Sequence, residues 1–144
     1  QHVAAIRRTW KGRMVLKGIL HPDDARSARA HGMDAVIVSN HGGRQLDDSL
    51  APLQALPAIV DAAGAMEVML DSGVRRGTDV LKALALGARC VFVGRPFNYA
   101  ATVAGQRGVA HAIALIAEEV RRDMGLLGIV DLREVDPGLL QRGR

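Results

Sequence analysis

Four short apolar runs recur along the chain, at residues 14–16, 35–38, 68–70 and 90–93. A loop follows each run, and then a stretch in which apolar positions recur with helical spacing. The runs begin 21, 33 and 22 residues apart. Strands this apolar are typical of parallel sheets that are buried on both faces. The pattern therefore predicts repeated βα units in an α/β fold.

Residues typical of helix N-termini predict helices before, between and after these apolar runs. Residues 2–10 predict a helix that packs ahead of the first strand. Pro22, Asp23 and Asp24 open the next helix, because proline suits the first turn and carboxylates suit its positive end. Residues 109–124 predict a long final helix, and the basic tail at residues 141–144 is expected to fray.

Two further helices are expected in the middle of the chain. Residues 50–63 carry apolar side chains on one helical face, and Pro57 is expected to bend or divide that helix. Thr78 and Asp79 are expected to cap a helix that runs through Leu86. Together with the strands, these helices give four βα units.

Four such units do not complete a closed barrel. A (β/α)8 barrel needs eight strands and typically ~250 residues, whereas this chain has 144. Four parallel strands leave two open edges and an uncovered apolar face. The pattern alone is compatible with an open four-stranded sheet or with half of a barrel.

Composition excludes some classes of partner and leaves a globular domain. The chain is 49% hydrophobic and 24% charged, with a net charge of +4. Its basic residues are scattered among acidic ones and only 3% of residues are aromatic, so we expect no nucleic-acid partner. No apolar run approaches the ~18 residues of a membrane span, and we expect no signal peptide. The first residue is Gln1 rather than Met, so we expect an incomplete product.

Cysteine and histidine usage adds little chemistry outside one motif. Cys90 lies inside an apolar run and is expected to be a small buried hydrophobe, with no disulfide possible within the chain. His21, Asp23 and Asp24 have no ligand spacing of known meaning. We therefore expect no metal site.

Residues 39–47, with the sequence SNHGGRQLD, carry the richest set of functional side chains. They follow the run at 35–38, and so lie at the carboxyl end of a strand, where α/β barrels carry their chemistry. His41 can transfer a proton near neutral pH, and Arg44 can bind a carboxylate through two parallel hydrogen bonds. The pair predicts proton abstraction from a small carboxylic acid.

Other strand ends add a cation and glycine-rich turns. Lys17 ends the first apolar run and would point into a barrel mouth. Residues 71–78, DSGVRRGT, follow the third run, and Gly94, Arg95 and Pro96 follow the fourth. A glycine-rich turn that leads into a helix forms an anion site from backbone N–H groups, and arginines strengthen it. Many barrels bind phosphate with the loops after their last two strands.

Together, these motifs resemble the FMN-dependent 2-hydroxy acid dehydrogenase and oxidase family, whose members act on lactate, glycolate and mandelate. SNHGGRQLD at 39–47 and DSGVRRGTDV at 71–80 are highly specific to that family, and ALALGA at 83–88 and GRP at 94–96 extend the match. The resemblance implies an α/β fold in which residues 1–144 form one partial domain. That domain would be the C-terminal half of a TIM (β/α)8 barrel, strands 5–8 with their helices.

The resemblance also implies roles for named residues. His41 would be the catalytic base, Arg44 would bind the substrate carboxylate, and Lys17 would lie at the N1/O2 edge of FMN. Ser39 would line the same pocket. The α-hydrogen would reach flavin N5 as hydride or by a carbanion route. The ribityl chain and phosphate of FMN would be held by Asp71, Ser72, Gly73, Val74, Arg75, Gly94 and Arg95.

The first half of the family barrel has no counterpart in the chain. That half supplies substrate-binding tyrosines and the aspartate that orients the base, and Tyr99 does not match those tyrosines. We therefore expect a chain that is inactive alone and needs a missing N-terminal half or self-association. The complete enzyme is expected to be a cytoplasmic homo-oligomer, peripheral to the inner membrane in some members. Membrane attachment itself cannot be read from this chain.

Two other functions fit parts of the pattern. A non-catalytic half-barrel that assembles with a partner and binds phosphate or flavin would keep the sites at 71–75 and 94–95 but give His41 no role. Another FMN- or phosphate-binding barrel, such as an isomerase, would not explain His41 paired with Arg44. Neither the particular hydroxy acid nor the electron acceptor is evident from the sequence.

Overall fold

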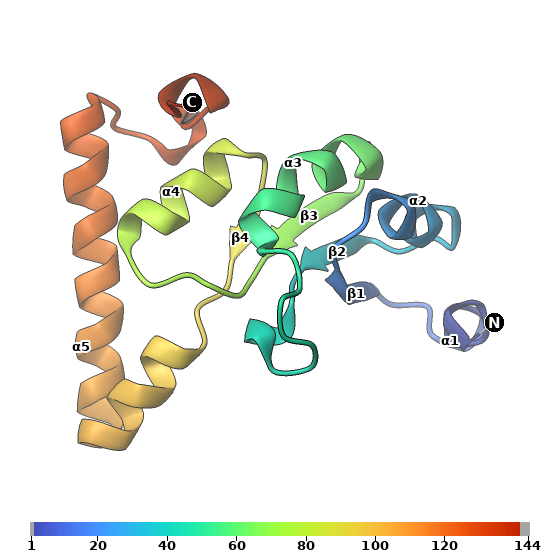
Figure 1. The fold of residues 1–144 in the computed structure, drawn as a ribbon, viewed down its shortest axis with the longest axis horizontal. Coiled ribbons are helices and arrows are strands. Elements are labelled where there is room, and N and C mark those ends of the chain that lie inside the picture. The colour runs from blue at the N-terminus through green and yellow to red at the C-terminus, as the bar shows by residue number, and fades with distance from the viewer. Residues whose placement is uncertain (1, 142–144) are drawn as a thin grey trace.

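A four-stranded parallel sheet forms the centre of the molecule in the computed structural model, which describes residues 2–141 (Figure 1). The strands are β1 (Val15–Ile19), β2 (Ala35–Val38), β3 (Glu67–Leu70) and β4 (Cys90–Val91). They lie side by side in chain order, each parallel to its neighbour. The predicted βα repetition and α/β class are confirmed.

Helices connect the strands and cover one face of the sheet. α2 packs against α3, and α4 packs against α5, whereas α1 lies at the opposite end of the molecule from α5 (Figure 1). Short 3-10 turns follow β2 and α5. The helices are α1 (His2–Thr9), α2 (Pro22–Ala30), α3 (Pro52–Ala63), α4 (Gly77–Ala85) and α5 (Arg95–Leu127), and the turns are η1 (His41–Gly43), η2 (Leu132–Glu134) and η3 (Pro137–Leu139).

The core lies between the sheet and these helices. Val36 pairs with Val68, and Val38 pairs with Leu70. All four are buried in one cluster with side chains of α2 and α3. Because alternate residues of a strand point to opposite faces, their neighbours point away from this core. Val15, Lys17, Glu67 and Cys90 on the strands are exposed, so the second face of the sheet is open.

The prediction that Cys90 is buried is wrong. The residue begins β4, the last strand of the sheet, and pairs with Met69 on β3. Its side chain is exposed because this row of the sheet lies on the open face. The apolar run around Cys90 was correctly identified as a strand, but burial on both faces requires a cover that the described residues do not provide.

The structure refines two helix predictions. α3 runs from Pro52 to Ala63, so Pro57 does not divide it. The final helix predicted over residues 109–124 lies within the later part of α5, and α5 also has an earlier part that was not predicted, which begins at Arg95 because Gly94 precedes it and Pro96 suits its first turn. Ala104 and Gly105 interrupt its helical backbone, with Gly105 at a φ of 55°.

The described chain ends at Gln141, so most of the tail expected to fray lies outside the described residues. Within residues 2–141, no helix is both long and apolar enough to cross a membrane.

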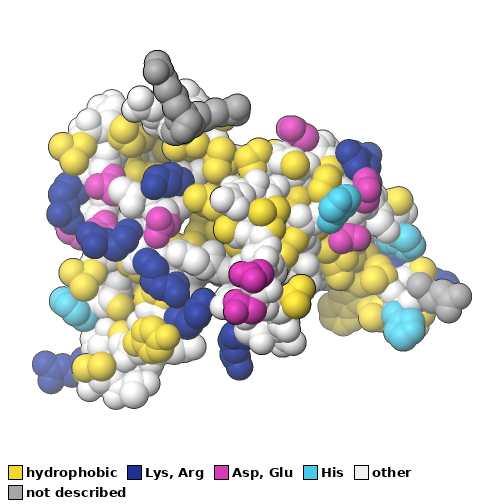
Figure 2. All heavy atoms as spheres, in the orientation of Figure 1, with side chains coloured by type: hydrophobic (Ala, Val, Ile, Leu, Met, Phe, Trp, Pro, Cys, Tyr) yellow, Lys and Arg dark blue, Asp and Glu magenta, His cyan; other side chains and the backbone are white. Residues whose placement is uncertain are grey.

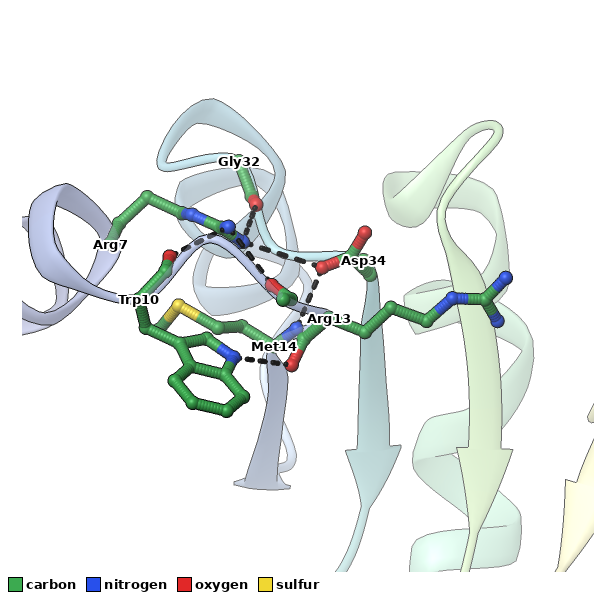
Figure 3. Close-up of polar contacts among 7 residues, drawn as sticks. Arg7, Trp10, Arg13, Met14, Gly32 and Asp34 are labelled. Atoms are coloured by element: carbon green, nitrogen blue, oxygen red, sulfur yellow. Dashed lines mark hydrogen bonds and ion pairs between the residues drawn. The ribbon is translucent and has the colours of Figure 1, made fainter.

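A polar cluster fixes the amino end of the sheet (Figure 3). The Arg7 guanidinium donates to the backbone carbonyls of Trp10 and Gly12, each at 2.9 Å. Its other nitrogen lies 3.4 Å from the Asp34 carboxylate, which accepts a 2.7 Å bond from the backbone N–H of Met14. These contacts attach the α1–β1 connection to the start of β2.

Candidate active site

The carboxyl ends of the four strands surround a cavity of about 420 Å³. The loops that follow β2, β3 and β4 form its walls, as expected for parallel strands whose carboxyl ends share one edge. Of the residues predicted for the site, all but Ser39 line this cavity. They are Lys17, His41, Arg44, Asp71, Ser72, Gly73, Val74, Arg75, Gly94 and Arg95.

Ser39 lies beneath the cavity and connects two of its residues. The side chain is only 1% exposed. Its hydroxyl oxygen is 2.8 Å from Lys17 Nζ and also accepts a 3.1 Å bond from the backbone N–H of His41. Ser39 therefore orients a cation and the histidine loop rather than presenting a group to a ligand.

Lys17 lies within β1 rather than at its end, since the strand continues to Ile19. Its Nζ is 2.8 Å from the Asp71 carboxylate. Partial burial alone would raise the pKa of Asp71. The hydrogen bonds from Lys17, Ser39 and Ser72, and the positive charge of Lys17, outweigh that effect and hold this pKa below its ordinary value. Asp71 is thus an ionised carboxylate that holds Lys17 in the cavity.

The backbone of Gly42 joins the three loops. Its N–H is bonded to Ser72 Oγ at 3.0 Å and to Asn40 Oδ1 at 2.9 Å. Its carbonyl accepts a 2.9 Å bond from the Arg95 guanidinium. Ser72 in turn donates to Asp71 at 2.8 Å. The loops after β2, β3 and β4 are therefore connected through η1.

His41 and Arg44 are exposed side chains on the loop after β2. His41 adopts a φ of 55°, in the left-handed region that few residues other than glycine occupy. Both side chains line the same cavity. The imidazole can transfer a proton of a ligand whose carboxylate the guanidinium binds.

The N-terminus of α4 differs from the predicted anion site. The Asp79 carboxylate accepts bonds from the backbone N–H groups of Arg75 and Arg76, at 2.9 and 3.0 Å. Glu119, on α5, accepts a 2.7 Å bond from Gly77 N–H and pairs with Arg76 at 2.8 Å. Carboxylates thus already occupy these three backbone donors. The anion-binding groups left in this region include the Arg75 and Arg95 side chains.

Sequence reasoning missed several residues of this region. Gln45, Phe92 and Asn98 also line the cavity. Asn98 was missed because α5 was expected to begin at 109. Glu119 is far along the chain from α4, and no local signal indicates that it reaches Gly77.

Cations outnumber carboxylates around the cavity. Among the residues that the structure describes, Lys17, Arg44, Arg75 and Arg95 line it, and Asp71 is the one acidic side chain in the lining. Figure 2 shows Lys and Arg side chains, with some Asp and Glu among them, over the part of the molecule that contains α4 and α5. The excess of positive charge favours an anionic ligand.

Comparison with known proteins identifies the family. The model of the FMN-dependent dehydrogenase family matches residues 1–142. An L-lactate dehydrogenase from Ectopseudomonas mendocina is 51% identical over 140 residues, which are 96% of this chain and 37% of that relative. An L-lactate oxidase from Nostoc sp. is 52% identical over 128 residues, which are 88% of this chain and 35% of that relative.

Solved structures agree with this result. A soluble mutant of the membrane-associated (S)-mandelate dehydrogenase from Pseudomonas putida superposes with a TM-score of 0.94 at 38% identity, over 98% of this chain and 40% of that chain. A mandelate oxidase solved with benzoyl-formic acid gives a TM-score of 0.87 at 48% identity, over 92% of this chain and 40% of that chain. The chain belongs to the FMN-dependent dehydrogenase family, and it spans a little over a third of the length of the curated relatives it matches.

Proposed function

We propose that residues 1–144 are the C-terminal half, strands 5–8, of a (β/α)8 barrel that oxidises a small L-2-hydroxy acid with FMN. One observation carries the proposal: ten residues predicted from the ends of four separate apolar runs line one cavity at the carboxyl ends of the strands. The open sheet face and the unpaired edges of β1 and β4 support the barrel half. So does the fraction of the relatives' length that the chain spans.

The residues of the cavity fit FMN. A phosphate group needs cations, which Arg75 and Arg95 supply, and it needs space close to the backbone. A Cβ placed on Gly73 or Gly94 would meet nothing within 4 Å, so the turns after β3 and β4 leave that space open. Asp71 and Ser72 offer polar partners for the ribityl hydroxyls. Lys17 would face the ring edge that becomes negative on reduction.

FMN, when bound, would accept the two electrons and the α-hydrogen that the substrate loses. In this proposal His41 takes the proton of the substrate hydroxyl, and Arg44 binds the substrate carboxylate with two parallel hydrogen bonds. The product is the 2-oxo acid. A lactate-like substrate is favoured by the names of the relatives, which include L-lactate dehydrogenases and an L-lactate oxidase.

A complementation experiment tests the proposal that this chain is the C-terminal half of the barrel. The chain would be co-expressed either with the N-terminal part or with the C-terminal part of the Ectopseudomonas mendocina relative. We expect FMN retention and L-lactate-dependent dye reduction only with the N-terminal part, and no turnover by the chain alone. Activity of the isolated chain, or complementation by the C-terminal part, would contradict the proposal.

His41→Gln tests the chemistry in the assembled protein. General-base removal is expected to lower kcat by about 10²- to 10⁴-fold while the flavin absorbance is retained. His111→Gln is the matched control, because His111 is an exposed histidine on α5, remote from the cavity lining. Flavin retention with equal turnover in both variants would favour a flavin-binding half-barrel in which His41 has no role.

Cys90 reports on assembly independently of catalysis. Its thiol is exposed on the open sheet face, so it is expected to react readily with a thiol reagent in the isolated chain. A complementary half that covers this face should slow that reaction by at least tenfold. An unchanged rate in an FMN-bound complex would show that the partner binds elsewhere.

A further inference from the structure

Strand β1 contains a bulge at Gly18. Lys17 pairs with Ile37 of β2 and Ile19 pairs with Val38, so Gly18 is an extra residue with no partner of its own. Its φ is 97°, a backbone conformation that residues other than glycine rarely adopt. The bulge therefore depends on glycine.

The bulge changes which way β1 presents its side chains. In a regular strand, residues 17 and 19 would share one face. Here Ile19 is buried in the core on the helix-covered face, whereas Lys17 reaches Ser39 and Asp71 at the cavity. Gly18 lies between these two directions, at the carboxyl end of the sheet.

The imidazole of His41 lies directly against Gly18. A Cβ built on Gly18 would come within 2.8 Å of Cε1 of His41, and within 3.6 and 3.7 Å of its two ring nitrogens. A contact of 2.8 Å is shorter than real Cβ atoms make. Any side chain at this position would therefore displace the ring.

Other contacts fix the backbone beneath that ring. The N–H of His41 is bonded to Ser39 on the β2 side. The next residue, Gly42, is bonded to Ser72 after β3 and to Arg95 after β4. The backbone of His41 and Gly42 is thus held by residues that follow β2, β3 and β4. The imidazole ring itself contacts the remaining strand, β1, at Gly18.

We propose that Gly18 is a positioning residue for His41: the glycine bulge in β1 provides the surface against which the imidazole rests. The catalytic consequence rests on the proposed function, but the ring position does not. The proposal can therefore be tested in the chain without FMN or substrate.

An NMR experiment on the unaltered chain tests the contact itself. Histidine ring signals would be assigned with a His41→Gln sample, which loses one Cε1–H resonance. We expect a strong nuclear Overhauser effect between that proton and an α-proton of Gly18. Its absence in a folded sample would overturn the proposal.

A pair of glycine variants separates positioning from backbone strain. Gly18→Ala and Gly128→Ala both place alanine at a positive φ, 97° and 73°, but a Cβ on Gly128 would meet nothing within 4 Å. Both are expected to lower Tm. Only Gly18→Ala is expected to move the His41 Cε1–H resonance, and an unchanged resonance would overturn the proposal. If Gly18→Ala fails to fold, the nuclear Overhauser measurement still decides.

The assembled protein provides a separate kinetic test. A ring displaced by about 1 Å can cost roughly 100-fold in rate, so Gly18→Ala should lower kcat more than it changes KM and should alter the pH profile. If the assembly does not oxidise 2-hydroxy acids at all, the proposed function fails while the NMR result on Gly18 stands.

Discussion

The two ends of the sheet use left-handed backbone in different ways. At the amino end, the turns that lead from a helix into the next strand contain glycines at positive φ: Gly32, Gly64 and Gly87. At the carboxyl end, three residues other than glycine adopt positive φ: His41, Asp48 and Ser72. Glycine makes this conformation without steric cost, whereas other residues store strain in it.

This difference indicates that the amino end of the sheet contributes mainly to stability and that the carboxyl end carries the functional side chains. The amino end has low-strain turns and the Arg7–Asp34 cluster of Figure 3, which attaches α1 to the sheet. The carboxyl end holds His41 and Ser72 in unfavourable conformations, and hydrogen bonds within and between the loops compensate for that strain. Strained residues kept in place by surrounding contacts often occur at functional sites. Substitutions at the two ends should therefore have different consequences.

Of the substitutions compared from here on, Arg44→Lys at the carboxyl end is expected to have the largest effect. Lysine keeps the charge but loses the two parallel hydrogen bonds of a guanidinium. In the complemented protein we expect a fall in kcat/KM for L-lactate of about 30-fold, or ~2 kcal/mol, mainly through KM. Steady-state kinetics would measure it. Arg121→Lys, on the exposed surface of α5, is the control, and equal kinetics in both variants would exclude a carboxylate-binding role for Arg44.

Sequence reasoning predicts features that depend on neighbouring residues better than features that depend on contacts between distant segments. The strand at residues 35–38 was predicted with its observed bounds, because a short apolar run flanked by polar residues is a local signal. The bulge at Gly18 was missed because it is defined only by pairing with β2. Sequence reasoning did not foresee that Glu119 reaches from α5 to the N-terminus of α4 and accepts a hydrogen bond from the N–H of Gly77. Contacts between distant segments are not encoded in spacing along the chain.

At the amino end, Asp34→Ala is expected to lower stability without affecting the site. It removes an acceptor from Met14 N–H and from Arg7, which should lower the free energy of unfolding by about 1–2 kcal/mol. Urea unfolding followed by circular dichroism would measure this change. Asp61→Ala, at an exposed position on α3, should change stability by less than about 0.5 kcal/mol. A shift of the His41 resonances in Asp34→Ala would contradict the separation of the two ends.

Asp71→Asn should produce a smaller and pH-dependent effect. The pKa of Asp71 is held below its ordinary value of 3.8, so its contribution to stability is present above that value and is lost as pH falls through the lowered pKa. The Lys17 side chain is 42% exposed, so solvent weakens the pair. We expect Asp71→Asn to cost about 1 kcal/mol at neutral pH. Urea unfolding between neutral and acidic pH should show this difference vanish at low pH, and a constant difference would contradict the pairing.

The smallest effect on stability is expected for Asp48→Gly, which tests whether a left-handed backbone conformation stores strain. Asp48 lies at a φ of 56° on the loop between β2 and α3, while its neighbour Asp47 is not among the residues at positive φ. Glycine at position 48 relieves strain but adds freedom to the unfolded chain, so Asp48→Gly should be nearly neutral. Asp47→Gly has only the entropic cost, about 0.5–1 kcal/mol. If urea unfolding shows equal losses for the two variants, the left-handed conformation of Asp48 stores no strain, and the contrast between the two ends of the sheet would rest on His41 and Ser72 alone.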